Sequence, residues 1–219
     1  MQLITIDGFE VFVEEADKYV KINDISAKDL PLVWESIRKG FPGYEFDLCF
    51  HHTQPPLEAL SSIGAELLED CIEMQVSRDG FIPWPCNDIT LLEKTDFAAF
   101  AKLHDKVNPD CGGTSQIIQR KWDNWRVFIL RKGGEIIGYS IICIAMRDAA
   151  VGEIFCVWAH NDSNRKALIS AVTNCAFENN KDVIIYMVDR DNAKEYDAAI
   201  EAGYKETGYY IGYQVKCIK

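Results

Sequence analysis

The chain has 219 residues, and its 34 aspartate and glutamate residues outnumber its 23 lysine and arginine residues, giving a formal net charge of −11 at pH 7. Hydrophobic residues make up 48% of the sequence, which is typical of a globular protein and excludes long disordered regions. The acidic balance disfavours a nucleic-acid partner and favours a cationic substrate such as an amine.

The distribution of apolar residues and cysteines predicts a cytoplasmic protein. The first residues, MQLITIDGFEVF, lack the basic stretch and continuous apolar run of a secretory signal, and no segment approaches the ~20 apolar residues that span a bilayer. The eight cysteines are scattered without a C-x-x-C pair, and several lie inside apolar runs such as IICIA and IFCVW. We therefore expect buried thiols in a reducing compartment, no metal site and no membrane association.

Strand and helix patterns alternate in the first part of the chain. We expect a strand over KYVKINDI (18–25), a helix over AKDLPLVWESIRKGF (27–41), a strand over FDLCF (46–50), a second helix, and a strand that ends at Val76. The following segment, SRDGFIPWPCND (77–88), contains two prolines and a glycine, which predicts a linker.

The same alternation continues from Asp88. DITLL (88–92) predicts a short strand and TDFAAFAKLHDKV (95–107) a helix, in which His104 is interpreted as a surface or packing residue. WRVFILR and EIIGYSIICIA, on either side of a Gly-Gly turn, predict a hairpin over 125–145.

The last third of the chain predicts two further strand–helix pairs and a final strand. GEIFCVWA (152–159) leads into a helix whose buried face carries Leu168, Val172, Cys175 and Ala176. DVIIYMV (182–188) predicts a strand buried on both faces, and the next helix starts at Asn192 with a capping box to Glu195 and ends at Gly203. TGYYIGYQVKC (207–217) predicts the closing strand.

An internal repeat is the best interpretation of this order, with chance similarity as the alternative. IGAELLEDCIEMQV (63–76) aligns without a gap with AGYKETGYYIGYQV (202–215), which places Gly64 over Gly203. A helix and an apolar strand precede each segment. The sequence therefore predicts a partial domain over 1–80, a linker over 81–87 and a complete domain over 88–219.

The second half resembles a known family through five segments in order: ITLLEKTDFAAFAKLH, GGEIIGYSIICI, EIFCVWA, KALISAV and NAKEYDAAIEAGY. These segments resemble the GNAT superfamily of acetyl-CoA-dependent N-acetyltransferases, and Asn192 and Gly203-Tyr204 stand at the spacing of that family's Asn and Gly-Phe. The resemblance implies an α/β fold with a mixed sheet, the GNAT-like acyl-CoA N-acyltransferase fold, in one partial and one complete copy.

Six polar residues, Asn161 to Lys166, crowd the start of the helix that contains KALISAV, and a helix N-terminus favours an anion. The GNAT pyrophosphate loop carries two glycine-like positions. Here one alignment places His160, Ser163 and Arg165 in the motif and another places Asp162, Arg165 and Ala167, so neither supplies both glycines. The alternatives are a phosphate site and a capped, solvated helix.

The resemblance assigns candidate cofactor-binding residues to two strands and two helix starts. They are the main chain of Cys156, Val157 and Trp158, then Ser163, Asn164, Arg165 and Lys166, and finally Asn192. For catalysis the resemblance indicates Glu153 as the base, whose alternative is a solvent-facing strand end. Ala199 occupies the position at which the family commonly has a tyrosine as general acid. Tyr196 is therefore the candidate acid, and its alternative is a packed aromatic residue.

The sequence thus predicts an N-acetyltransferase that moves an acetyl group from acetyl-CoA to a small amine or amino-acid-like acceptor. One alternative is an inactive CoA-binding or acyl-sensing module on a degenerate GNAT scaffold, and another is a structural protein on that scaffold. The pseudo-repeat favours a monomer over a dimer.

Overall fold

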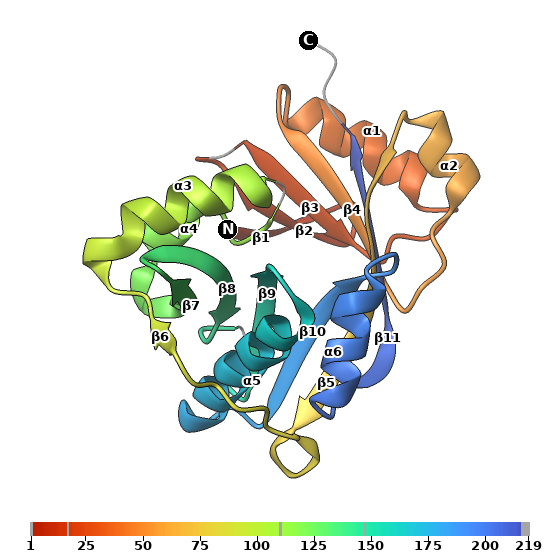
Figure 1. Cartoon of the computed structure of the whole chain (residues 1–219). Helices are drawn as coiled ribbons and strands as arrows, with labels where there is room; N and C mark the ends of the chain where they lie inside the picture. The colour runs from red at the N-terminus through yellow and green to blue at the C-terminus, as the bar shows by residue number, and fades with distance from the viewer. Residues whose placement is uncertain (1, 17, 110, 147, 216–219) are drawn as a thin grey trace. The chain divides into compact units, whose positions relative to one another are not determined.

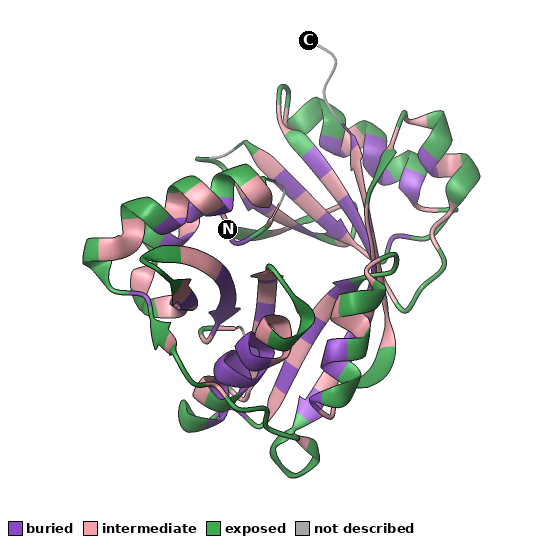
Figure 2. Ribbon diagram, viewed as in Figure 1, coloured by how far each residue is buried: buried purple, intermediate pink, exposed green. Residues whose placement is uncertain are grey.

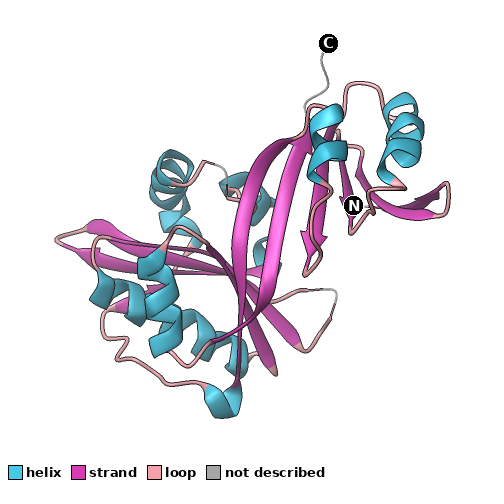
Figure 3. Ribbon diagram, turned by 90° about the vertical axis from the view of Figure 1, so that its right-hand side faces the viewer, coloured by secondary structure: helices cyan, strands magenta, loops and turns pink. Residues whose placement is uncertain are grey.

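The computed structural model describes residues 2–16, 18–109, 111–146 and 148–215. These residues form two compact units. Unit 1 comprises the described residues between 1 and 72 and between 208 and 219, and unit 2 those from Glu73 to Thr207. Two long strands, β5 (Glu66–Ser77) and β11 (Lys205–Val215), contribute one end to each unit (Figures 1 and 3).

Unit 1 is a sheet with two helices. Its strand order is β1 (Gln2–Ile6), β2 (Phe9–Glu14), β3 (Tyr19–Asn23), β4 (Glu45–His51), the end of β11 and the start of β5. Strands β3 and β4 are parallel, and β4 and β11 are antiparallel. The helices are α1 (Leu30–Gly40) and α2 (Leu57–Ser62). The sequence patterns assigned no element to residues 2–14, which form the β1–β2 hairpin.

One apolar face of α1 packs into the core of unit 1. Leu30, Val33, Trp34 and Ile37 recur at i, i+3, i+4 and i+7 and are all buried. The Trp34 ring meets the ring of Phe46 in β4 edge to face, with 5.0 Å between the ring centroids.

Unit 2 is a sheet with helices on both faces. Its strand order is β6 (Ile89–Leu91), β7 (Trp125–Lys132), β8 (Glu135–Cys143), β9 (Val151–Ala159), β10 (Val183–Asp189) and the end of β5. The helices are α3 (Phe97–Val107), α4 (Ser115–Arg120), α5 (Asp162–Glu178) and α6 (Ala193–Glu201), with short 3₁₀ turns at Arg78–Gly80, Lys94–Asp96 and Trp122–Asn124.

Alternate residues of β8 show why this strand is mainly apolar. Tyr139 and Ile141 pack in the cluster that includes Phe100 of α3 and Ile118 of α4. On the other face the Ser140 hydroxyl donates to the carbonyl of Leu168 in α5, at 3.2 Å. Because helices cover both faces, the strand is buried from Gly138 to Cys143.

Helix α5 is buried on more than the side that faces the sheet. Most of its residues from Ala167 to Phe177 are buried (Figure 2). The segment predicted as a linker packs against it, since the Trp84 N–H donates to the Ser170 hydroxyl at 2.8 Å and the Cys86 thiol to the carbonyl of Ala167.

Several local predictions are confirmed. The β7–β8 hairpin turns at Gly133 and Gly134, which both have positive φ, and α6 follows the cap residue Asn192. Strand β11 ends at Val215, and the predicted strand residues Lys216 and Cys217 lie outside the described residues. Within the described ranges, no helix is both long and apolar enough to cross a membrane.

The order strand–helix–strand–helix–strand occurs twice in the chain. It runs through β3, α1, β4, α2 and β5, and again through β9, α5, β10, α6 and β11. The first two strands of each series are parallel. In each series a glycine with positive φ, Gly64 or Gly203, follows the second helix and lies two residues before the last strand.

Gly203 provides a test of the packing around α6. Its φ is +90°, and a Cβ there would collide with the carbonyl oxygen of Gly80, whereas Gly134, with φ +88°, has open space around it. We expect Gly203→Ala to lower the free energy of unfolding by about 3 kcal/mol and Gly134→Ala by about 1 kcal/mol, since only the first adds a clash to the backbone strain. Urea unfolding measures both, and equal losses would contradict the packing.

Candidate active site

Strands β9 and β10 run side by side and then part. Their parallel register extends from Val151 opposite Val183 to Ile154 opposite Tyr186. Strand β9 continues to Ala159 and β10 to Asp189, but these described residues have no further pairing with each other. An opening between two neighbouring strands therefore lies at their carboxyl ends.

A bulge in β9 coincides with this opening. Ile141 of β8 pairs with Cys156, but the next residue, Ile142, pairs with Ile154, so Phe155 is an extra residue in β9. A bulge bends its strand and increases the local twist, which turns β9 away from β10. Among the described residues, the main-chain groups of residues 156–159 that point away from β8 then have no strand partner.

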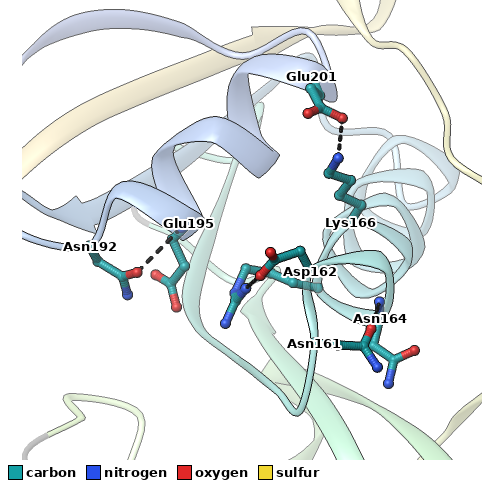
Figure 4. Close-up of polar contacts among 8 residues, drawn as sticks. Asn161, Asp162, Asn164, Lys166, Asn192, Glu195 and Glu201 are labelled. Carbon is teal, nitrogen blue, oxygen red and sulfur yellow. Dashed lines mark hydrogen bonds and ion pairs between the residues drawn. The ribbon is translucent and has the colours of Figure 1, made fainter.

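Two helices begin at the edge where β9 and β10 end. Asn161 caps α5 by accepting from the N–H of Asn164 at 2.9 Å, and Asn192 caps α6 by accepting from the N–H of Glu195 at 3.3 Å (Figure 4). Helix N-termini carry N–H groups without intrahelical partners and a partial positive charge. The cap at Asn161 uses one of these donors and leaves the rest of the first turn for a ligand or water.

Arg165 has a buried donor without a protein partner. Its Nη1 donates to Oδ1 of Asp162 at 2.6 Å, and its side chain is only 12% exposed. Its Nε is buried and has no hydrogen-bond partner among the described residues. An unpaired buried N–H is costly, so an acceptor from a ligand suits this position.

Lys166 lies in a different environment from Arg165. Its ammonium pairs with the carboxylate of Glu201 near the end of α6 (Figure 4) and lies over the Trp84 ring, 5.1 Å from the centroid. The two basic residues that the sequence places together in one phosphate site thus contact different groups.

Glu195 is a carboxyl group at the start of α6, and the only role expected for it from the sequence was capping. In the expected capping box, the Glu195 carboxylate would accept from the N–H of Asn192. That N–H instead donates to the carbonyl of Asp189 at 2.9 Å. The Glu195 carboxyl accepts instead from the Tyr186 hydroxyl, 3.0 Å away in β10. Burial raises the pKa of Glu195 to about 7, against the opposing effects of the Tyr186 hydrogen bond and the Arg165 charge.

The predicted residues of β9 lie on or beside the opening. Glu153 belongs to the paired part of the strand, opposite Ile185 in β10 and Cys143 in β8. Cys156 and Trp158 pack toward the cluster formed with α3 and α4, and Val157 is buried. Ser163 and Asn164 lie in the first turn of α5.

Tyr196, the acid expected from the sequence, also lies on α6 but contacts a different group from Glu195. Its hydroxyl lies 3.5 Å from Oε2 of Glu206, at the start of β11. Ala199 is fully buried, and Glu195 precedes it by four residues, so these two share one helix face. That spacing, together with a tyrosine inside an apolar strand, is the sequence signal that would have indicated Glu195.

No family model matches the sequence, and no curated protein matches it. A GCN5-related N-acetyltransferase from Kribbella flavida is similar in structure, with 13% identity, a TM-score of 0.70, and coverage of 97% of this chain and 88% of that one. One from Sphaerobacter thermophilus has 14% identity, a TM-score of 0.63 and coverage of 94% and 75%. A tandem GNAT protein from the clavulanic acid biosynthesis pathway has 10% identity, a TM-score of 0.55 and coverage of 98% and 81%.

These similarities show the fold. The chain has the mixed α/β fold of the GNAT acetyltransferases, which confirms the α/β class and the mixed sheet expected from its sequence. The division into one partial and one complete copy stays a prediction. At identities of 10% to 14% the likeness extends to the fold alone.

Glu195 makes stability depend on pH. Its pKa is about 7 in the folded protein against an ordinary 4.5, so folding takes up a proton between these values and the folded state loses stability as pH rises. We expect the free energy of unfolding of the wild type to fall by about 1 kcal/mol between pH 6 and pH 8 because of this group. Glu195→Gln should remove that decrease. Urea unfolding at both pH values measures it. Glu178→Gln, at an exposed carboxyl, is the control, and an unchanged pH slope in Glu195→Gln would contradict the assignment.

Proposed function

We propose that the chain is an acyltransferase that moves an acetyl group from acetyl-CoA to a small-molecule amine. The observation that carries the proposal is the opening between β9 and β10 beyond Ile154 and Tyr186, bordered by the N-termini of α5 and α6. The fold shared with GNAT acetyltransferases supports it. The net charge of −11 favours a cationic acceptor.

Acetyl-CoA supplies an acyl group activated as a thioester, and the groups around the opening fit this cosubstrate. The main chain of Cys156, Val157 and Trp158 lacks a partner strand on one side and would pair with the amides of the pantetheine arm, beside the Asn192 side chain. The first turn of α5 would hold the diphosphate through Ser163 and Asn164.

The buried Nε of Arg165 is the strongest sign of fit for that diphosphate, because an anion would supply the acceptor that the protein does not. Lys166 would join this site only by leaving Glu201.

Glu153 would accept the proton of the attacking amine. A Cβ at Gly152 would meet Ala176 of α5, so Gly152 faces that helix and Glu153, the next residue of the strand, points to the opposite face. Cys156 and Trp158 pack on that same opposite face. An ammonium substrate approaching there meets a carboxylate that both attracts and deprotonates it.

Glu195 would return a proton to the leaving thiolate. With a pKa of about 7 the carboxyl is partly protonated at neutral pH, as a general acid requires, and Tyr186 holds its position through the 3.0 Å hydrogen bond. Tyr196, the acid expected from sequence, instead has its hydroxyl near Glu206.

The domain arrangement is part of the proposal: a partial copy over 1–80, a linker over 81–87 and a complete copy over 88–219, in a monomeric, cytoplasmic protein. The repeated order of elements supports this arrangement. So does the similarity in fold to a tandem GNAT protein.

Calorimetric titration of acetyl-CoA tests the binding site. We expect Arg165→Ala to weaken binding by about 10- to 100-fold, because it removes charge-assisted hydrogen bonds to phosphate. Lys166→Ala is the matched control and should change affinity by less than about threefold, since its ammonium is held by Glu201. The reverse order would place the phosphate at Lys166, and no binding by the wild type would overturn the proposal.

Release of free thiol from acetyl-CoA, with a panel of amines, tests the chemistry. Glu153→Gln and Glu195→Gln should each lower kcat by about 100-fold while acetyl-CoA affinity stays within a fewfold of the wild type. Tyr196→Phe is the control and should retain activity. A large loss in Tyr196→Phe with full activity in Glu195→Gln would return the acid role to Tyr196. Binding without thiol release for any amine would indicate a CoA-binding module.

A further inference from the structure

A cavity of about 230 Å³ lies in unit 2, where the edge strand β6, the start of β7 and helix α4 meet. Its wall contains none of the residues assigned above to acetyl-CoA or to catalysis. An apolar cavity of roughly 150 Å³ in a protein core is already large enough to hold benzene. The apolar part of the wall consists of Leu91, Leu92, Ile118, Trp122 and Val127.

The indole of Trp125 belongs to this wall and carries a donor without a partner. The residue is only 8% exposed, and its Nε1 is buried with no hydrogen-bond partner among the described residues. Its Cζ3 lies on the side of Gly113, where an added Cβ would meet it at 3.3 Å. Nε1 is attached to the ring atom opposite Cζ3, so the N–H lies at the other end of the indole, which is left for the cavity. A buried N–H without an acceptor is costly, and a ligand oxygen would remove that cost.

Arg126 supplies a cation at the same wall. Its Nη1 donates to the carbonyl of Asp123 at 3.1 Å and to the carbonyl of Trp125 at 2.8 Å, which holds the half-buried guanidinium at the start of β7. In the part of the chain that the structure describes, no carboxylate forms an ion pair with Arg126. Neutral carbonyl groups do not balance its charge, so an anion is the partner that suits this position.

Asp123 is the acidic residue of the wall, and its effect on a ligand is weaker. Asp123 is exposed, so water and salt screen its charge, whereas Trp125 is buried and Arg126 is half-buried. A carboxylate therefore gains more from the guanidinium and the indole N–H than it loses to Asp123.

We propose that this cavity binds a small carboxylate that has an apolar body. The carboxylate pairs with the Arg126 guanidinium, a ligand oxygen accepts from Nε1 of Trp125, and the body lies against the apolar wall. Nε1 is closed off from solvent, so the wall beside it moves outward slightly when the ligand enters. The wall residues belong to neither β9 nor β10, and the inference therefore goes beyond the proposed function and does not depend on it.

Ligand-observed NMR titration of benzoate into the full-length protein tests the site. We expect a dissociation constant of about 1 mM or below, within the range open to so small a ligand. Benzyl alcohol and benzylamine keep the ring but lack the negative charge, and both should bind at least about tenfold more weakly. Equal affinity for benzylamine would overturn the inference, because Asp123 rather than Arg126 would then select the ligand.

The indole N–H signals of the tryptophans show where benzoate binds. In a nitrogen–proton correlation spectrum, the Trp125 signal should shift as benzoate saturates, because its N–H gains an acceptor, while the signal of Trp34 in unit 1 should stay in place. Trp125→Phe identifies the signal by its loss. It removes the donor but keeps an aromatic ring, and benzoate affinity should fall by about threefold or more. Saturable binding that leaves the Trp125 signal in place would overturn the site.

Charge variants test the choice of an anion. Arg126→Gln should weaken benzoate binding by at least about tenfold, and Asp123→Asn should strengthen it by about twofold, since it removes a negative charge from the wall. Lys121→Gln is the matched control, because this exposed cation is close in sequence but outside the wall, and its affinity should stay within about twofold. Unchanged affinity in Arg126→Gln would overturn the inference, as would no binding by the wild type at about 20 mM benzoate.

Arg126→Lys covers the case in which Arg126→Gln does not fold. It keeps the charge but loses the planar fork, so its affinity should lie below that of the wild type and remain measurable. None of these titrations contains a coenzyme. Failure to bind acetyl-CoA would therefore overturn the proposed function and leave this site standing, and failure to bind benzoate would do the reverse.

Discussion

One extra residue in β9 is the constraint on which the candidate site depends. Phe155 has no paired residue in β8, yet β9 pairs with β8 on both sides of Phe155, so the strand must bend. Strand β10 has β5 along its other edge and ends its pairing with β9 at Tyr186. In the part of the chain that the structure describes, the main chain of residues 156–159 therefore has no strand partner on the side away from β8. Such groups require hydrogen-bond partners, which an extended ligand or ordered water supplies.

The charges around the opening are linked through one guanidinium. Arg165 bonds to Asp162, and its charge also lowers the proton affinity of Glu195, although burial of that carboxyl is the larger effect. In the proposed complex, a phosphate that competes with Asp162 for Arg165 would add negative charge beside Glu195 and raise its pKa further. Anion binding at α5 would therefore favour the protonated carboxyl at α6.

Features set by neighbouring residues were predictable from the sequence, and features set by distant residues were not. The Gly133-Gly134 hairpin and the positive φ of Gly203 follow from local backbone preferences. The partners Tyr186 and Glu195 belong to different elements, so no local pattern joins them. The bulge was also hidden, because EIFCVWA is apolar on both faces and an extra residue breaks no alternation there.

The position of β11 has a consequence for the order in which the protein is assembled. In unit 1 this strand lies between β4 and β5, although residues 208–215 follow every residue of unit 2 in the chain. During translation, the edges of β4 and β5 in unit 1 stay unpaired while residues 73–207 are made. Exposed strand edges invite pairing with other chains. The half of the protein that leaves the ribosome first thus completes its sheet last, and until then it is the part most open to aggregation.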